Sequence, residues 1–155
     1  MKKNLLINAI SSFFFIGYIP VAPGTWASML AVFIWLIIPV NSLSIKLLII
    51  GCLLVIGIIV AGLAERYSGE VDPSYVVIDE VVGMWLALLL IPQNLMTNRL
   101  PLIFMTFCIF RLFDIVKFFP INNCEKIRGG IGIMLDDIVA GIFTAIVMNL
   151  IIWLL

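Results

Sequence analysis

Carboxylate side chains stand in three apolar stretches of this sequence, where charged groups are not expected. Asp79 and Glu80 lie near the start of one stretch, Asp114 lies in the middle of the next, and Asp136 and Asp137 lie near the start of the last. A charged side chain at membrane depth costs about 2.5 kcal/mol or more, so it is normally paired, placed in a cavity or functional. These five acids are therefore the first candidates for catalytic residues.

A shared metal ion would explain why five acids stand in such surroundings. Carboxylates brought together repel one another, and a hard divalent cation relieves this repulsion because it prefers oxygen ligands. The sequence has no histidine, which excludes histidine-based zinc sites and catalytic triads. Its cysteines also lack the arginine that a cysteine-phosphatase loop needs. We therefore expect Mg²⁺, with these candidate ligands: Asp79, Glu80, Asp114, Asp136 and Asp137.

Each acid also has a purely structural interpretation. Arg111 and Asp114 are three residues apart, a spacing that allows an ion pair on one helix. Asp79 and Asp136 are residues of the type that caps the start of a helix. Such roles are reasonable for one acid at a time and weaker for all five together.

Basic residues and one glycine turn are candidates for binding phosphate. Arg111, Lys117 and Arg128 carry groups that form charge-assisted hydrogen bonds with phosphate oxygens. The general retention of positive charge on the cytoplasmic side also explains Arg128, but it explains the deeper Arg111 poorly. Gly24 and Thr25 open an apolar stretch, where a helix N-terminus would offer free N–H groups to an anion. A plain turn is the simpler interpretation of these two residues.

The composition indicates an integral membrane protein. Hydrophobic residues make up 64% of the 155 residues, and the mean hydropathy is +1.26. A soluble domain is nearer half apolar, and a chain of this size cannot bury the excess in one core. The formal net charge is zero, and nothing suggests a nucleic-acid partner. No linker divides the chain, so residues 1–155 are expected to form a single domain.

The apolar stretches predict an all-α membrane bundle with about five spans. Residues 5–19 form a stretch too short to cross a bilayer, so we expect an interfacial or re-entrant helix there. The five spans are expected to begin near residues 26, 45, 76, 102 and 136, within these apolar stretches: 26–40, 45–64, 75–91, 102–119 and 133–155.

The basic residues predict how such a bundle is oriented. The following fall on one side of the expected topology: Lys2, Lys3, Arg66, Lys117, Lys126 and Arg128. Lys46 and Arg99 fall on the other side. Cytoplasmic loops carry the excess of basic residues, so the first side is expected to be cytoplasmic. The five acids fall on that same side.

Small residues four positions apart predict which helices touch. Gly83 and Ala87 have this spacing, as do Asp137, Gly141 and Ala145. Small residues let helix backbones approach closely in lipid. We therefore expect the helix that carries Asp79 to pack against the helix that carries Asp137.

Four blocks of this sequence resemble, in order and spacing, those of the phosphatidylglycerophosphatase A family. They are PVAPGTWASML (20–30), VVIDEVVGMWLAL (76–88), FRLFDIVKFFPI (110–121) and GGIGIMLDDIVAG (129–141). The resemblance implies a multi-pass, Mg²⁺-dependent phosphatase of the bacterial inner (cytoplasmic) membrane. Its substrate would be the phospholipid phosphatidylglycerophosphate, and its products would be phosphatidylglycerol and inorganic phosphate.

The resemblance also implies which residues form the site. Family residues carry over to seven matching positions: Asp79, Glu80, Arg111, Asp114, Lys117, Asp136 and Asp137. Two positions depart from the family pattern. Phe118-Phe119 stands where Pro-Trp is common, and Ala27 stands where a glycine is common. Neither departure replaces a charged group.

Two alternative functions are weighed against the sequence, and the identity of the nucleophile is left open. A CDP-alcohol phosphotransferase is excluded because the sequence has no Asp-Gly pair. An ion or proton transporter would also carry intramembrane acids, but it would need acids near both faces. In a phosphatase the nucleophile would be water or one of the carboxylates, and the absence of a neutral base favours water. The oligomeric state does not follow from the sequence.

Overall fold

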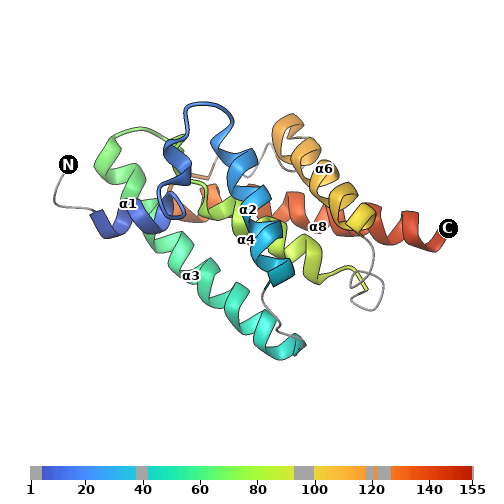
Figure 1. The fold of residues 1–155 in the computed structure, drawn as a ribbon. Helices are drawn as coiled ribbons and strands as arrows, with labels where there is room; N and C mark the ends of the chain where they lie inside the picture. The colour runs from blue at the N-terminus through green and yellow to red at the C-terminus, as the bar shows by residue number, and fades with distance from the viewer. Residues whose placement is uncertain (1–4, 38–41, 93–99, 118–120, 122–126, 155) are drawn as a thin grey trace.

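Helices make up all the regular structure in the part of the chain that the computed structural model describes, which is residues 5–37, 42–92, 100–117, 121 and 127–154. In chain order they are α1 (Leu5–Ser11), the single 3₁₀ turn η2 (Ile16–Tyr18), α2 (Pro23–Ile37), α3 (Leu43–Ser68), α4 (Ile78–Leu89), α6 (Leu100–Val116) and α8 (Gly130–Leu154) (Figure 1). The predicted all-α class is confirmed. Some residues used in the sequence argument lie outside the described residues: Lys2, Lys3, Arg99, Lys126 and the ends of the stretches 26–40, 102–119 and 133–155.

The N-terminal segment is not the single helix expected over residues 5–19. Helix α1 ends at Ser11, and three phenylalanines at 13–15 then adopt positive φ angles of 45, 57 and 69°. The hydroxyl of Ser12 accepts a hydrogen bond from the N–H of Phe15 at 3.1 Å. Such local bonds from serine compete with the helical ladder, which apolar periodicity alone does not reveal.

Two described helices are long and apolar enough to cross a membrane. They are α3 and α8, with 26 and 25 residues. Five spans are not supported, because α2 and α4 have only 15 and 12 residues and α6 has 17 with Arg111 and Asp114 inside it. A full span needs about 20 apolar residues. The expected spans were too long because apolar composition continues past the helix ends, as it does through residues 75–77 before α4.

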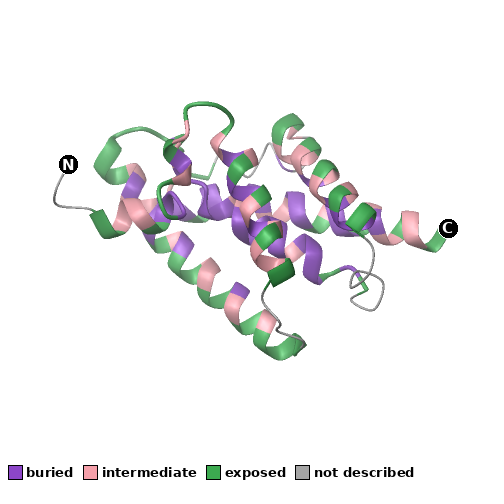
Figure 2. Cartoon of the chain, in the orientation of Figure 1, coloured by how far each residue is buried: buried purple, intermediate pink, exposed green. Residues whose placement is uncertain are grey.

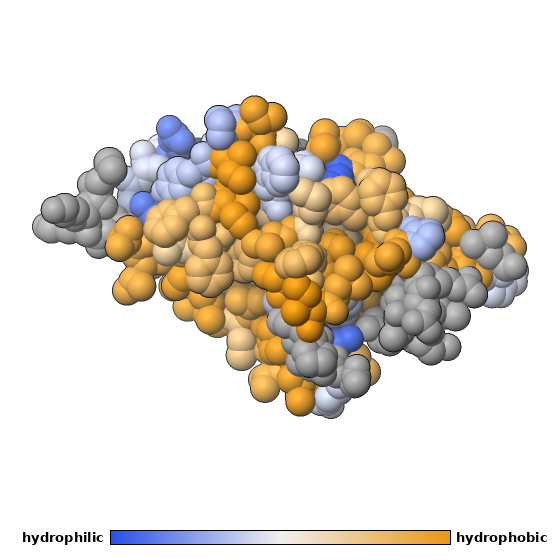
Figure 3. Space-filling view, viewed as in Figure 1, coloured by the Kyte–Doolittle hydropathy of each residue, from blue (hydrophilic) through white to orange (hydrophobic). Residues whose placement is uncertain are grey.

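The exposed surface of these helices is what a lipid environment requires. Only 28% and 33% of the most apolar windows of α3 and α8 are buried, whereas core helices of soluble proteins are mostly buried. Figure 2 shows exposed residues along the outer side of α3, and Figure 3 shows apolar side chains over most of the visible face. A large contiguous apolar surface marks an interaction with a membrane or a partner. The molecule therefore has the features of a membrane protein.

Helix α4 is the centre of the bundle. It packs against α2, α3, α6 and α8, and ten of its twelve residues are buried (Figures 1 and 2). The indole N–H of Trp85 donates a hydrogen bond to the carbonyl oxygen of Ala31 at 2.8 Å, which joins α4 to α2. A short helix with little exposed surface can therefore hold charged residues away from lipid.

Glycines set the close approach between α8 and its neighbours. A Cβ atom at Gly83 would lie 2.5 Å from the carbonyl oxygen of Asp137, and one at Gly141 would overlap the carbonyl group of Gly83. A Cβ at Gly130 would overlap the carbonyl of Ile58 in α3. The predicted contact between the helices of Asp79 and Asp137 is confirmed. It depends on Gly83 and Gly141 having no Cβ atom.

Replacing Gly83 by alanine tests the α4–α8 contact. The added methyl group meets backbone that cannot rotate away, and overpacking of this kind costs roughly 1–3 kcal/mol. We expect Gly83→Ala to lower the midpoint of thermal unfolding in detergent by several degrees. The matched control is Gly51→Ala in α3, where an added Cβ meets nothing within 4 Å. Equal midpoints for the two variants would contradict this account of the packing.

Candidate active site

Helix ends from distant parts of the sequence meet at one side of the bundle. The starts of α2, α4 and α8 lie there with the ends of α3 and α6, because successive long helices run in opposite directions (Figure 1). Direct contacts join them: Ser28 to Glu80, Arg111 to Glu80, Lys117 to Asp136, and Glu65 to Gly129. The prediction that the acids gather at one side is confirmed for the described residues.

Arg111 joins two of the acids. Its Nη1 atom lies 2.6 Å from Oε2 of Glu80 in α4 and 2.8 Å from Oδ2 of Asp114 in its own helix. The three side chains are only 13–15% exposed. The intrahelical ion pair that the spacing allowed is therefore present, together with an interhelical one. Breaking a buried pair leaves an uncompensated charge and costs about 3–5 kcal/mol, so Arg111 holds α4 and α6 together.

Ser28 and Gly24 shape the other side of Glu80. The Ser28 hydroxyl lies 2.9 Å from the carbonyl oxygen of Gly24 and 3.2 Å from Oε2 of Glu80, and it accepts a hydrogen bond from Arg111 at 3.3 Å. A Cβ at Gly24 would overlap the Glu80 carboxylate. Gly24 was predicted to approach a phosphate, but the anion that lies against it is the carboxylate of Glu80. Thr25 is half-buried in the first turn of α2.

Ser28 is a site residue that the sequence argument missed. It is fully buried, and it is the last polar residue of α2 before a run of apolar residues. Its position four residues after Gly24 places both on one face of the helix. That spacing is the signal from which Ser28 could have been found.

Lys117 holds a third acid. Its Nζ atom lies 2.8 Å from Oδ2 of Asp136, which is only 5% exposed. Lys117 follows the last residue of α6 and has a φ of +46°, a conformation that is uncommon for residues other than glycine. The end of α6 is thus turned so that the lysine reaches α8.

Asp79 and Asp137 are the two acids without a described counter-charge. They are 7% and 3% exposed, and Oδ1 of each is buried with no hydrogen-bond partner among the described residues. Their charges repel each other, and both also feel the charge of Asp136. Buried polar atoms in folded proteins are nearly always hydrogen-bonded. Together with Nε of Arg111, these two oxygens are therefore the exceptional atoms of the described site.

The capping roles considered for Asp79 and Asp136 are wrong. The residue before α4 is Val77, and no side chain caps that helix. Helix α8 begins at Gly130, so Asp136 lies well inside it. Helix α8 opens with glycine and isoleucine residues, which carry no polar capping group. The sequence pattern therefore did not show where this helix begins.

The carboxylates do not by themselves form a complete metal site. No group of three or more Asp, Glu or Cys side chains among the described residues is arranged to hold a metal ion. Three of the five acids are engaged by Arg111 and Lys117. Asp79 and Asp137 remain, and they supply only oxygen donors. Mg²⁺ is commonly bound by one or two carboxylates together with substrate phosphates and waters, so this pair fits it.

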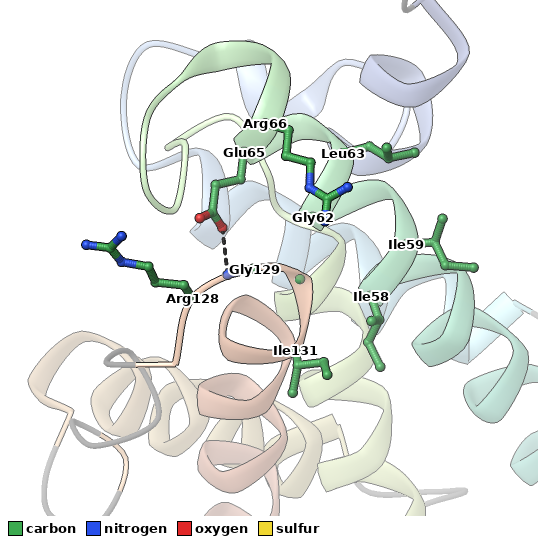
Figure 4. Close-up of a pocket in the computed structure, with 10 residues that line it drawn as sticks. Ile58, Ile59, Gly62, Leu63, Glu65, Arg66, Arg128, Gly129 and Ile131 are labelled. Carbon is green, nitrogen blue, oxygen red and sulfur yellow. Dashed lines mark hydrogen bonds between the residues drawn. The ribbon is translucent and has the colours of Figure 1, made fainter.

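Two neighbouring pockets lie at this end of the bundle, and both are lined by Glu65. The smaller one has a volume of about 220 Å³, and Glu65, Asp72 and Asp136 are among the residues that line it. The larger one, of about 580 Å³, lies between the end of α3 and the start of α8 and contains Arg128 (Figure 4). Arg128, predicted to bind phosphate with Arg111 and Lys117, is therefore placed in an adjoining pocket.

Comparisons with known proteins agree on one family. The family described as phosphatidylglycerophosphatase A matches residues 9–152. A protein of Escherichia coli strain K12 named phosphatidylglycerophosphatase A is 33% identical over 83% of this chain and 73% of its own length. A Haemophilus influenzae protein of the same name is 35% identical over 96% of this chain and 91% of its own length.

A further relative carries a different name. A Bacteroides thetaiotaomicron protein named as a candidate phosphatidylinositol-3-phosphatase is 36% identical, with 99% of this chain and 98% of that protein covered. No solved structure matches the chain significantly.

Neutralising an unpaired acid should stabilise the protein when no cation is present. We expect Asp79→Asn and Asp137→Asn each to raise the free energy of unfolding by about 1–3 kcal/mol in chelator-treated detergent solution, because each removes a buried, uncompensated charge. Thermal unfolding followed by circular dichroism measures this. Glu70→Gln, at an exposed acid, is the control and should change nothing. A lower midpoint for both aspartate variants would mean that these carboxylates have partners.

Proposed function

The chain belongs to the phosphatidylglycerophosphatase A family, and we propose that it removes the terminal phosphate of phosphatidylglycerophosphate to leave phosphatidylglycerol and inorganic phosphate. The observation that carries this proposal is the pair of buried acids, Asp79 and Asp137, whose Oδ1 atoms have no described hydrogen-bond partner. They belong to the cluster in which Arg111 and Lys117 pair with other acids, and Asp136 of that cluster lines a pocket. An ion or proton transporter finds no support in the family.

The relative from Bacteroides thetaiotaomicron points to the same class of reaction. Its name describes removal of a phosphate monoester from an anionic phospholipid, as the proposed reaction does. The two names differ only in the alcohol that carries the phosphate. Phosphatidylglycerophosphate is the better substrate proposal, because two relatives and the family description share it.

Mg²⁺ is the proposed cofactor, and Asp79 and Asp137 are its proposed protein ligands. Their unpartnered Oδ1 atoms and the all-oxygen donor set support this choice. When bound, the ion would supply positive charge against the oxygens of the phosphoryl group as it is transferred. This reduces the five metal ligands expected from the sequence to two, with Glu80, Asp114 and Asp136 as the acids that position the basic groups.

The basic residues have separate proposed roles. Arg111 is fixed through Nη1, while its buried Nε has no hydrogen-bond partner and is proposed to donate to a phosphate oxygen. Lys117, oriented by Asp136, is proposed to bind another oxygen of the same group. Ser28 and Gly24 act through Glu80 and are positioning residues. Their fixed partners pre-organise the site before substrate binds.

Phosphate release measures this proposal directly. We expect the purified protein to release phosphate from phosphatidylglycerophosphate in detergent with Mg²⁺, to stop in EDTA, and to recover when Mg²⁺ is restored. Asp79→Asn and Asp137→Asn should each lower kcat/KM at least about 100-fold, because each removes a proposed metal ligand. Glu70→Gln, a change at an exposed acid that is not one of the proposed site residues, is the control.

Three results would count against the proposal. Full turnover in EDTA would remove the metal from the mechanism. Normal turnover in both aspartate variants would remove the acids. Faster release from phosphatidylinositol 3-phosphate than from phosphatidylglycerophosphate would transfer the substrate assignment to the class named for the Bacteroides relative.

The site is proposed to face the cytoplasm in a multi-pass protein of the bacterial inner membrane. Arg66, Lys117 and Arg128 lie at the end of the bundle that carries the acids, whereas Lys46 lies at the start of α3. The excess of basic residues supports a cytoplasmic location for that end. Helices α3 and α8 are the described helices that would cross the bilayer.

A cysteine placed at Glu70 reports the orientation. Glu70 is exposed just after α3, at the end that carries the acids. In a background in which the native cysteines are alanine, a membrane-impermeant maleimide should label Glu70→Cys in inside-out vesicles and not in intact cells. The same substitution at Leu43, exposed at the other end of α3, should give the reverse pattern. Labelling of the Glu70 position in intact cells would contradict the proposed orientation.

A further inference from the structure

The larger pocket has two chemically different parts. Ile58, Ile59 and Leu63 of α3 and Ile131 of α8 form an apolar wall, and Ile59 and Ile131 are more than half exposed. Beyond this wall the pocket is charged. The apolar part lies between the two described helices that are long enough to cross a membrane. A hydrocarbon chain would pack against this apolar wall through van der Waals contacts.

Two arginines flank the charged part. Figure 4 shows Arg66 of α3 and Arg128 on opposite sides of Glu65, with Ile58 and Ile59 farther along α3. Both arginines are exposed, and neither forms an ion pair with any described residue. Guanidinium groups bind phosphate oxygens in a planar, two-pronged geometry. They are therefore available to an anionic group that enters the pocket from outside.

Glu65 cancels only part of this positive charge. Its Oε2 atom accepts a hydrogen bond from the backbone N–H of Gly129 at 3.0 Å, which ties the carboxylate to the start of α8. The charged residues that line the pocket are two arginines and this one glutamate, so their net charge is +1. The pocket therefore favours a singly negative group over a neutral one.

The pocket also adjoins the candidate active site. Glu65 lines both the larger pocket and the smaller one that reaches Asp136. A molecule in the larger pocket could thus extend past Glu65 toward the acids. Such a molecule needs an apolar chain, a singly charged anion beside it, and a second anionic group beyond it.

We propose that the groove between α3 and α8 binds the diacylglycerol side of the substrate, with Arg66 and Arg128 on the phosphodiester and an acyl chain on Ile58, Ile59, Leu63 and Ile131. This inference rests on the proposed function, since phosphatidylglycerophosphate carries a phosphodiester between its acyl chains and its terminal phosphate. Arg66 and Arg128 then select substrates that have this second phosphate, and they take no part in the chemical step.

Kinetics of the double variant Arg66→Gln/Arg128→Gln test the assignment. We expect KM for phosphatidylglycerophosphate to rise about tenfold while kcat stays within twofold, because two charge-assisted contacts are lost outside the reacting centre. Phosphatidylglycerol, which keeps only the phosphodiester, should lose about the same factor as a competitive inhibitor. Phosphatidic acid, which has acyl chains and a monoester but no phosphodiester, should show an unchanged KM.

Matched variants separate this subsite from general effects of charge and folding. Arg66→Lys/Arg128→Lys should recover part of the affinity, and Lys46→Gln, at the opposite end of α3, should behave like the wild type. An unchanged KM and inhibition constant in the double variant would overturn the inference. An equal rise in KM for phosphatidic acid would also overturn it, because the arginines would then attract any anionic lipid. No turnover of phosphatidylglycerophosphate by the wild type would instead overturn the proposed function.

Discussion

The excess of negative charge at one end of the bundle is the constraint on which the rest of the structure depends. Five carboxylates lie there with Arg111 and Lys117, so this group has a formal net charge of −3. The cost of such a charge rises steeply as water is removed. Arg111 pairs with Glu80 and Asp114, and Lys117 pairs with Asp136, so no described cation compensates Asp79 or Asp137. Under the proposed function these two carboxylates bind a cation, and their buried charge lowers the stability of the protein while no cation is bound.

The packing of the helices maintains this unfavourable arrangement. Gly83 and Gly141 let α4 and α8 approach until backbone meets backbone, and this brings Asp79 and Asp137 into one electrostatic environment. Gly24 makes room for Glu80, which the Arg111 ion pair then fixes. In lipid, where apolar side chains gain little by leaving the solvent, close packing of small residues is a main source of helix association. The glycines are therefore as necessary to the site as the acids.

How far the sequence predicted the molecule depends on the kind of interaction. The acids were found because charge in an apolar stretch is costly, and the α4–α8 contact was found because small residues recur at helical spacing. The break at residues 13–15 was missed, since it arises from local hydrogen bonds of Ser12. The number of spans was overestimated because apolar residues also line the buried helix α4. The pair of Arg111 with Asp114 followed from their spacing on one helix. The pairs of Arg111 with Glu80 and of Lys117 with Asp136 were beyond prediction, because they depend on which helix faces each cation across the bundle.

The position of a bound divalent cation tests the central claim most directly. Mn²⁺ can replace Mg²⁺ at oxygen-ligand sites and scatters X-rays anomalously, so a crystal of the full chain grown with Mn²⁺ and phosphate would locate it. The account predicts an anomalous peak within coordination distance of carboxylate oxygens of both Asp79 and Asp137. A peak held instead by Glu80 and Asp114, with Arg111 displaced, would contradict it.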